Sequence, residues 1–246
     1  MSGHSKWSTI KYKKGAKDAQ RGKVFAKLAR AIEVAAREGG GDPAMNAALS
    51  QAIEKAKSAS MPNDNVERAI KRGTGEVEGA AYEELWYEGY AAGGVALYVQ
   101  VLTDNRNRAA SDVRSTFSRN EGSLGEPGSV GYLFHQKAYI LVSGDEDEVM
   151  LAALEAGAED VRGSGGQWEV TGAPGDLGAI RDALQAAGLD VETAEVTQLP
   201  STSVPVGESK ARQVLRLVDA LEDLDDVQAV YANFDIGDEV LAAIAE

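Results

Sequence analysis

Apolar positions between about Gln20 and Gly73 repeat every three to four residues, the spacing of amphipathic helices. The first such helix is expected to end at Gly39-Gly40-Gly41. For the second helix, Asp42 is the expected N-cap and Pro43 the first helical residue. The apolar residues expected on the inner faces of these two helices are Val24, Phe25, Leu28, Ile32 and Ala35, and then Met45, Leu49, Ala52, Ile53 and Ala56.

A third, shorter helix is predicted to begin near Met61-Pro62-Asn63. Asp64 and Glu67 have the spacing of a capping box, and Gly73 is the expected end. Residues 21–73 are therefore predicted to form a three-helix unit.

The period changes from helical to alternating at Tyr82. Two strands, 85–90 and 95–102, are predicted to form a hairpin around Gly93-Gly94. A helix over 107–120 and a strand over 130–134 follow. Residues 137–199 then show the order βαββαβ, which is typical of a ferredoxin-like unit.

After a Pro- and Ser-rich linker at 200–205 come one helix and one strand, 227–234. Because a lone helix and strand cannot bury their apolar faces, they are expected to fold back onto 80–135. The predicted fold class is a multidomain α and α+β protein. It has an N-terminal three-helix domain and two α+β domains, the second ferredoxin-like and inserted into the first. The predicted domains are an arm at 1–20, a helical domain at 21–79, a discontinuous α+β domain at 80–135 plus 205–246, and the inserted domain at 136–204.

Charge is divided unevenly along the chain. Residues 1–30 hold nine Lys and Arg and a single acid, Asp18, although the whole 246-residue chain has a net charge of −14. Cations concentrated on an acidic protein are typical of a surface that binds a polyanion, because each neutralised phosphate releases counterions. The alternative is an ordinary solvated Lys-rich terminus.

Composition excludes several kinds of catalytic site. The chain contains no Cys, and His4 and His135 are its two histidines, so thiolate chemistry, a His-based triad and a multi-His metal site are not expected. No cofactor, small-molecule substrate or membrane segment is predicted, and the expected location is the cytoplasm.

Three groups of residues are candidates for function. The cations of the N-terminal part are expected to contact phosphates, together with two arginines beside a predicted helix N-terminus. These residues are Lys6, Lys11, Lys13, Lys14, Lys17, Arg21, Lys23, Lys27, Arg106 and Arg108. Trp7 and Tyr12 fit two roles, stacking on bases or anchoring the arm to a neighbouring domain.

The segment Asp104–Arg108 also has two interpretations. It brings two guanidinium groups to a helix N-terminus, which favours a phosphate contact. Alternatively, Asp104 or Asn105 caps the helix and the arginines pair with local acids. A more distant alternative is a metal-dependent nuclease site built from Glu83, Glu84, Glu88 or Asp104.

Eight sequence blocks, in order, resemble the YebC family, which includes the mitochondrial translational activator of cytochrome oxidase subunit one. The blocks lie at 3–7, 17–23, 39–43, 61–65, 68–75, 87–90, 102–108 and 128–134. The resemblance implies three domains, one helical and two α+β, with one α+β domain interrupted by the other. It also implies a non-enzymatic regulator of gene expression, either a DNA-binding transcriptional regulator or a translation factor that acts at the ribosome on ribosomal RNA.

Overall fold

The computed structural model describes residues 18–237, 240 and 244. The described residues begin with three helices: α2 (Asp18–Gly39), α3 (Ala47–Ser58) and α4 (Asn63–Gly73). They pack around a small core that includes Ile32, Leu49 and Ala69, each fully buried. This confirms the predicted helical unit and its end at Gly73, whereas Val24 is 40% exposed rather than part of the core.

The predicted start of the second helix was wrong. α3 begins after Asn46, whose side-chain oxygen accepts a hydrogen bond from the Leu49 N–H at 3.1 Å. Asp42 instead stabilises an exposed turn by accepting from the Ala44 N–H at 2.9 Å, and Met45 is 84% exposed. Asn46 rather than Asp42 is the N-cap, because its amide is buried and also donates to the carbonyls of Ala35 and Gly40 at the end of α2.

The predicted capping box at the start of α4 was also wrong. Pro62 occupies the N-cap position without a side-chain hydrogen bond, and Asp64 lies inside the first turn. The carboxylate of Asp64 still interacts favourably with the positive end of the helix dipole.

The first sheet contains four strands in the order β3-β1-β2-β9. Their bounds are β1 Glu83–Ala91, β2 Val95–Thr103, β3 Ser123–Leu124 and β9 Val227–Ala232. β1 and β2 form the predicted antiparallel hairpin, and β9 pairs with β2 from more than a hundred residues away. The C-terminal return onto the first α+β unit is therefore confirmed.

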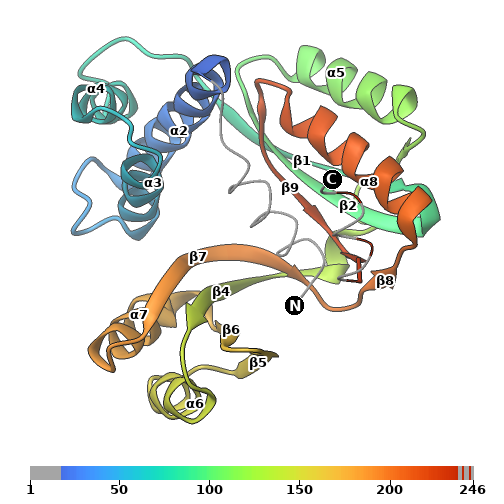
Figure 1. Ribbon diagram of the computed structural model, residues 1–246. Helices are drawn as coiled ribbons and strands as arrows, with labels where there is room; N and C mark the ends of the chain where they lie inside the picture. The colour runs from blue at the N-terminus through green and yellow to red at the C-terminus, as the bar shows by residue number, and fades with distance from the viewer. Residues whose placement is uncertain (1–17, 238–239, 241–243, 245–246) are drawn as a thin grey trace.

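Helices α5 (Arg106–Arg119) and α8 (Glu208–Glu222) cover one face of this sheet (Figure 1). Their apolar residues, among them Phe117, Leu217 and Leu221, are buried against Leu97 and Val99 of β2. Gly89 of β1 has no room for a side chain, because a Cβ there would lie 2.6 Å from both the Phe117 ring and the Ser123 carbonyl oxygen.

The strand predicted over 130–134 is absent from the described structure. Gly131–Leu133 forms a 3-10 turn, and β4 (Phe134–Ser143) begins only at its end. The carboxylate of Glu88 on β1 accepts hydrogen bonds from the N–H groups of Gly128, Val130 and Gly131 at 2.6–2.7 Å. These bonds hold the segment as a loop rather than as a strand.

The inserted unit has the predicted βαββαβ order. It consists of β4, α6 (Glu146–Glu155), β5 (Asp160–Ser164), β6 (Gln167–Gly172), α7 (Leu177–Ala186) and β7 (Asp190–Pro200). Its antiparallel sheet has the order β5-β6-β4-β7, and its core includes Ile140, Val170, Ile180 and Leu184. The predicted fold class is confirmed. The linker segment contains β8 (Val204–Pro205), which pairs in parallel with β10 (Phe234–Asp235).

Each of the three units contacts the other two at its edges (Figure 1). An ion pair between Lys55 and Glu195 at 2.7 Å links α3 to β7, and Arg181 on α7 lies 3.5 Å from Glu54 on α3. The side of α2 beside the first sheet reaches the turn between α8 and β9, where the candidate site lies (Figure 1). The helices among the described residues are too short or too polar to span a lipid bilayer.

Candidate nucleic-acid interface

Most of the predicted arm lies outside the described residues. This applies to Lys6, Trp7, Lys11, Tyr12, Lys13, Lys14 and Lys17. Arg21 lies within α2, which continues the same cationic segment into the described structure. Lys23, Lys27, Arg106 and Arg108 can be placed in detail.

Lys23 and Lys27 project from α2 onto the C-terminal end of α8. The Lys23 ammonium donates to the carbonyl oxygen of Asp223 at 3.2 Å, and the Lys27 ammonium donates to that of Glu222 at 2.5 Å. The last carbonyls of a helix lack intrahelical partners and carry the negative end of its dipole, so cations there are stabilising. Burial lowers the pKa of Lys27, an effect that nearby Glu222, Asp223 and Asp225 oppose.

Arg30, one turn further along α2, contacts the same region through more bonds. Its guanidinium donates to the carbonyl oxygens of Asp225 at 2.7 Å and Leu102 at 3.1 Å, and to the carboxylate of Asp226 at 3.2 Å. It also lies 5.1 Å from the centre of the Tyr82 ring. Arg30 therefore joins the helical unit to both β2 and the start of β9.

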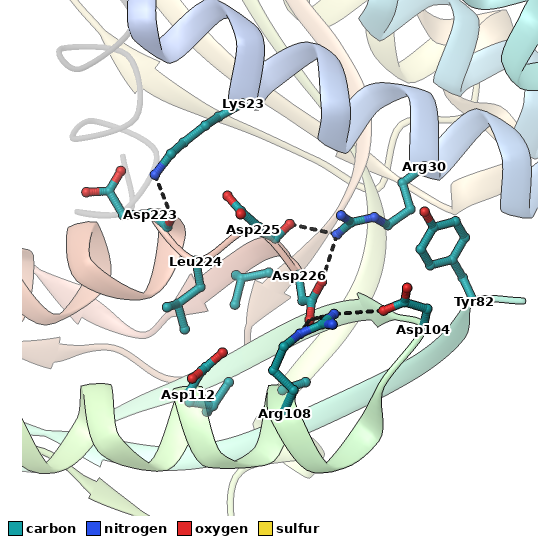
Figure 2. A pocket seen from close by; sticks show the side chains of 13 residues that line it. Lys23, Arg30, Tyr82, Asp104, Arg108, Asp112, Asp223, Leu224, Asp225 and Asp226 are labelled. Carbon is teal, nitrogen blue, oxygen red and sulfur yellow. Dashed lines mark hydrogen bonds and ion pairs between the residues drawn. The ribbon is translucent and has the colours of Figure 1, made fainter. Parts of the chain in front are cut away.

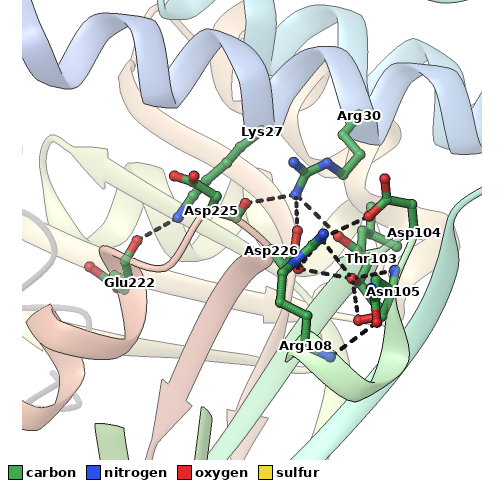
Figure 3. Close-up of polar contacts among 10 residues, drawn as sticks. Lys27, Arg30, Thr103, Asp104, Asn105, Arg108, Glu222, Asp225 and Asp226 are labelled. Carbon is green, nitrogen blue, oxygen red and sulfur yellow. Dashed lines mark hydrogen bonds and ion pairs between the residues drawn. The ribbon is translucent and has the colours of Figure 1, made fainter. Parts of the chain in front are cut away.

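Asp226 is the buried centre of this cluster, with only 8% of its surface exposed. Besides Arg30, it accepts hydrogen bonds from Arg108 at 2.8 Å and from the Thr103 hydroxyl at 2.8 Å (Figure 3). A buried carboxylate needs such partners, because an unpaired charge in a low-dielectric environment is strongly unfavourable. Two guanidinium groups from different parts of the chain meet this requirement.

The segment Asp104–Arg108 is held mainly by hydrogen bonds between its own residues. Asn105 caps α5 by accepting from the Arg108 N–H at 3.1 Å, and Arg108 donates to Asp104 at 2.7 Å. Hydrogen bonds to Asp226 and Asp104 raise the pKa of Arg108, and the bond from Arg108 lowers the pKa of Asp104. This geometry corresponds to the alternative in which the segment caps the helix and Arg108 pairs with local acids.

Arg106 differs from Arg108 in being exposed without a hydrogen bond or ion pair among the described residues. Arg114, two turns further along α5, is also exposed, and its guanidinium likewise has no such partner in the described part of the chain. Both lie near Tyr87, where burial raises the pKa of the hydroxyl and the two arginines oppose that rise. Arg106 and Arg114 thus form a cationic strip on α5.

A cavity of about 530 Å³ opens between α2, α5 and the turn that precedes β9 (Figure 2). Lys23, Arg30 and Arg108 lie on its wall together with five aspartates: Asp104, Asp112, Asp223, Asp225 and Asp226. Anions from the chain itself therefore surround the predicted cations here.

Comparison with known proteins places the chain in a family. A family model described as the TACO1/YebC N-terminal domain matches residues 5–76, and one described as the TACO1/YebC second and third domain matches residues 82–234. The chain belongs to the TACO1/YebC family. The resemblance inferred from the eight sequence blocks is confirmed.

Relatives in the TACO1/YebC family match this chain over its full length. A protein of Rubrobacter xylanophilus is 60% identical over 249 residues, covering 100% of both chains, and one of Beutenbergia cavernae is 59% identical over 251 residues with the same coverage. Both are named probable transcriptional regulatory proteins. The crystal structure of a conserved hypothetical protein from Aquifex aeolicus has a TM-score of 0.79 and 48% identity, covering 91% of this chain and 94% of that one.

Three of the four carboxylates of the nuclease alternative bind other groups in this TACO1/YebC fold. Glu88 holds the loop before β4, Asp104 pairs with Arg108, and Glu84 accepts from Gln100 at 2.9 Å. Among the described residues, no group of three or more His, Cys, Asp or Glu is arranged to hold a metal ion.

Sequence reasoning missed Arg30, Arg114 and Asp226. The first had a signal, because Lys23, Lys27 and Arg30 recur at four and three residues and so share one helix face. Asp226 had none, since it is one of several acids in a run and only the fold shows which of them is buried.

Proposed function

We propose that this chain is a non-enzymatic regulator of transcription that binds DNA in the cytoplasm without a cofactor. The observation that carries the proposal is the name shared by relatives that match it from end to end, probable transcriptional regulatory protein. The cationic segment 1–30 on an acidic chain supports nucleic acid as the partner.

Phosphate contacts are proposed for Lys6, Lys11, Lys13, Lys14, Lys17, Arg21, Lys23, Lys27 and Arg106. Arg108 is a weaker candidate, because Asp104 and Asp226 both bind it. Trp7 and Tyr12 would stack on bases or anchor the arm.

Duplex DNA binding across a salt series tests the proposal. Lys13→Glu/Lys14→Glu is expected to weaken binding and to reduce the slope of log affinity against log salt by about 2, since each phosphate contact contributes about 0.9. The matched control is Lys137→Glu/Arg162→Glu in the inserted unit, where both side chains already pair with acids. Equal loss in both double variants, or none in either, would contradict the assignment of the arm.

A second candidate function is translational regulation through ribosomal RNA. It is favoured by the match to models that join YebC with TACO1, since the resemblance links this family to a mitochondrial translational activator. Lysines bind phosphates of DNA and RNA alike, so the same variants apply. Co-sedimentation with ribosomes that persists at salt concentrations where duplex binding is lost, and that requires Lys13 and Lys14, would favour translation.

A further inference from the structure

The side of α2 that faces the first sheet is cationic and already in contact with anionic groups of the chain. Lys23, Lys27 and Arg30 lie within eight consecutive residues, about 10 Å of helix. All three donate to oxygen atoms of residues 222–226, here called the acidic turn. Lys23, Lys27 and Arg30 are therefore not free in this structure.

The acidic turn resembles a short polyanion in its chemistry. Its sequence is Glu222-Asp223-Leu224-Asp225-Asp226, with four carboxylates in five residues, and it begins at the negative end of α8. Carboxylate and carbonyl oxygens accept hydrogen bonds from ammonium and guanidinium groups as phosphate oxygens do. The turn and a phosphate chain would thus compete for the same donors.

The contacts differ in strength along α2. At one end, Lys23 makes a single exposed contact of 3.2 Å, and the carboxylates of Asp223 and Asp225 are exposed without an ion pair among the described residues. At the other end, Asp226 is buried between two arginines and a threonine. An exposed contact of a lysine contributes little to stability because water competes for the ammonium, whereas separating a buried ion pair is strongly unfavourable.

We propose that the acidic turn occupies part of the nucleic-acid-binding surface of α2, and that a sugar-phosphate chain displaces it from Lys23 and Lys27. The Arg30–Asp226–Arg108 cluster stays closed and keeps the helical unit attached to the first sheet. By competing for Lys23 and Lys27, the acidic turn lowers the affinity of the protein for polyanions that bind these two lysines only weakly. This inference rests on the proposed function, because it concerns regulation of the same surface.

The first test neutralises the exposed carboxylates of the turn. Asp223→Asn/Asp225→Asn is expected to bind a 30-base-pair duplex roughly three- to tenfold more tightly than wild type at fixed salt, because two negative charges that lie near Lys27 and compete with phosphate are removed. The matched control is Asp147→Asn/Glu148→Gln on α6, which changes net charge equally at exposed positions of the inserted unit. Equal gains in both double variants would overturn the inference, because net charge alone would then explain them.

The second test measures displacement directly in the wild-type chain. A carbodiimide joins ammonium and carboxylate groups that lie close together, and Lys27 has Glu222, Asp223 and Asp225 near it. Saturating duplex is expected to reduce at least twofold the yield of cross-links from Lys23 or Lys27 to the acidic turn, measured by mass spectrometry of peptides. An unchanged yield with duplex bound would overturn the inference and leave the proposed function intact. Absence of duplex binding by wild type and both variants, even at low salt, would overturn the proposed function and this inference with it.

Discussion

At the residue scale, Glu88 shows how one carboxylate determines a local conformation. Its two oxygens accept three backbone hydrogen bonds from the loop before β4, and it is 9% exposed. Burial acts to raise the pKa of Glu88, but the backbone N–H groups outweigh it, and the pKa lies below its ordinary value. The charged form of Glu88 therefore stabilises the folded state.

Replacing Glu88 by glutamine tests this role. Glu88→Gln presents an NH₂ group to backbone donors, so it should reduce the free energy of unfolding at pH 7 by roughly 2–4 kcal/mol. Urea unfolding followed by tryptophan fluorescence measures the change. Glu83→Gln, at an exposed position of the same strand, is the control and should change stability by less than about 0.5 kcal/mol.

The lowered pKa of Glu88 predicts that the free energy of unfolding depends on pH. Because the folded-state pKa of Glu88 is depressed, its contribution is complete above the unfolded-state pKa of about 4.3 and is lost as pH falls through the folded-state value. The difference in unfolding free energy between wild type and Glu88→Gln should hence be constant near pH 7 and shrink below pH about 4.3. A difference that grew on acidification would contradict the assignment.

The role of Glu88 could not be predicted from the sequence. It stands among acids at a strand edge, which suggested a metal site as one alternative. Its partners lie 40 to 43 residues further along the chain, and they are backbone groups whose residue types carry no signal.

At the element scale, the start of α3 depends on one buried amide. Asn46 caps α3 and donates to two carbonyls at the end of α2, at 2.8 Å each. The sequence pattern favoured Asp42-Pro43, because Pro is common at the first helical position. Local rules could not distinguish the two starts, since the deciding contacts come from the neighbouring helix.

The paired variants Asn46→Ala and Asp42→Ala separate the two interpretations. Asn46→Ala leaves a helix N–H and two carbonyls without their partner, so a loss of about 2 kcal/mol is expected. Asp42→Ala removes one exposed turn contact and should change stability by less than about 0.5 kcal/mol. Chemical unfolding of both proteins measures these values, and a larger loss for Asp42→Ala would mean that the predicted cap matters more.

At the scale of the whole molecule, the Arg30–Asp226 pair joins units that are far apart in sequence. The two side chains are 14% and 11% exposed, and they connect α2 to the strand that closes the first sheet. Arg30 also binds the carbonyl of Leu102 at the end of β2. This cluster is therefore expected to couple unfolding of the helical unit to that of the sheet.

Removing the guanidinium should weaken that coupling. Arg30→Gln leaves Asp226 with fewer partners, and a loss of roughly 2–3 kcal/mol is expected for breaking a largely buried pair. Native-state hydrogen exchange measures the effect. Relative to wild type, Arg30→Gln should accelerate amide exchange more in α2, α3 and α4 than in β1 and β2. Lys23→Gln, at an exposed position with one contact, is the control and should cost less than about 1 kcal/mol. Uniformly faster exchange in all elements would instead indicate a single cooperative unit.

The sequence by itself determined the identity of most elements and the fold class. The repeat of apolar residues and the glycine stops are local, so the three helices, the hairpin and the βαββαβ unit followed from neighbouring residues alone. It also determined where positive charge is concentrated, because formal charge belongs to each residue.

Only the tertiary structure decided which of those charges are engaged. Lys23 meets Asp223 from 200 residues away, and Arg30 meets Asp226 from 196. The free energy of a charged group depends on its burial and its partners. Both are set when distant segments pack together, so the spacing of residues along the chain carries little information about them.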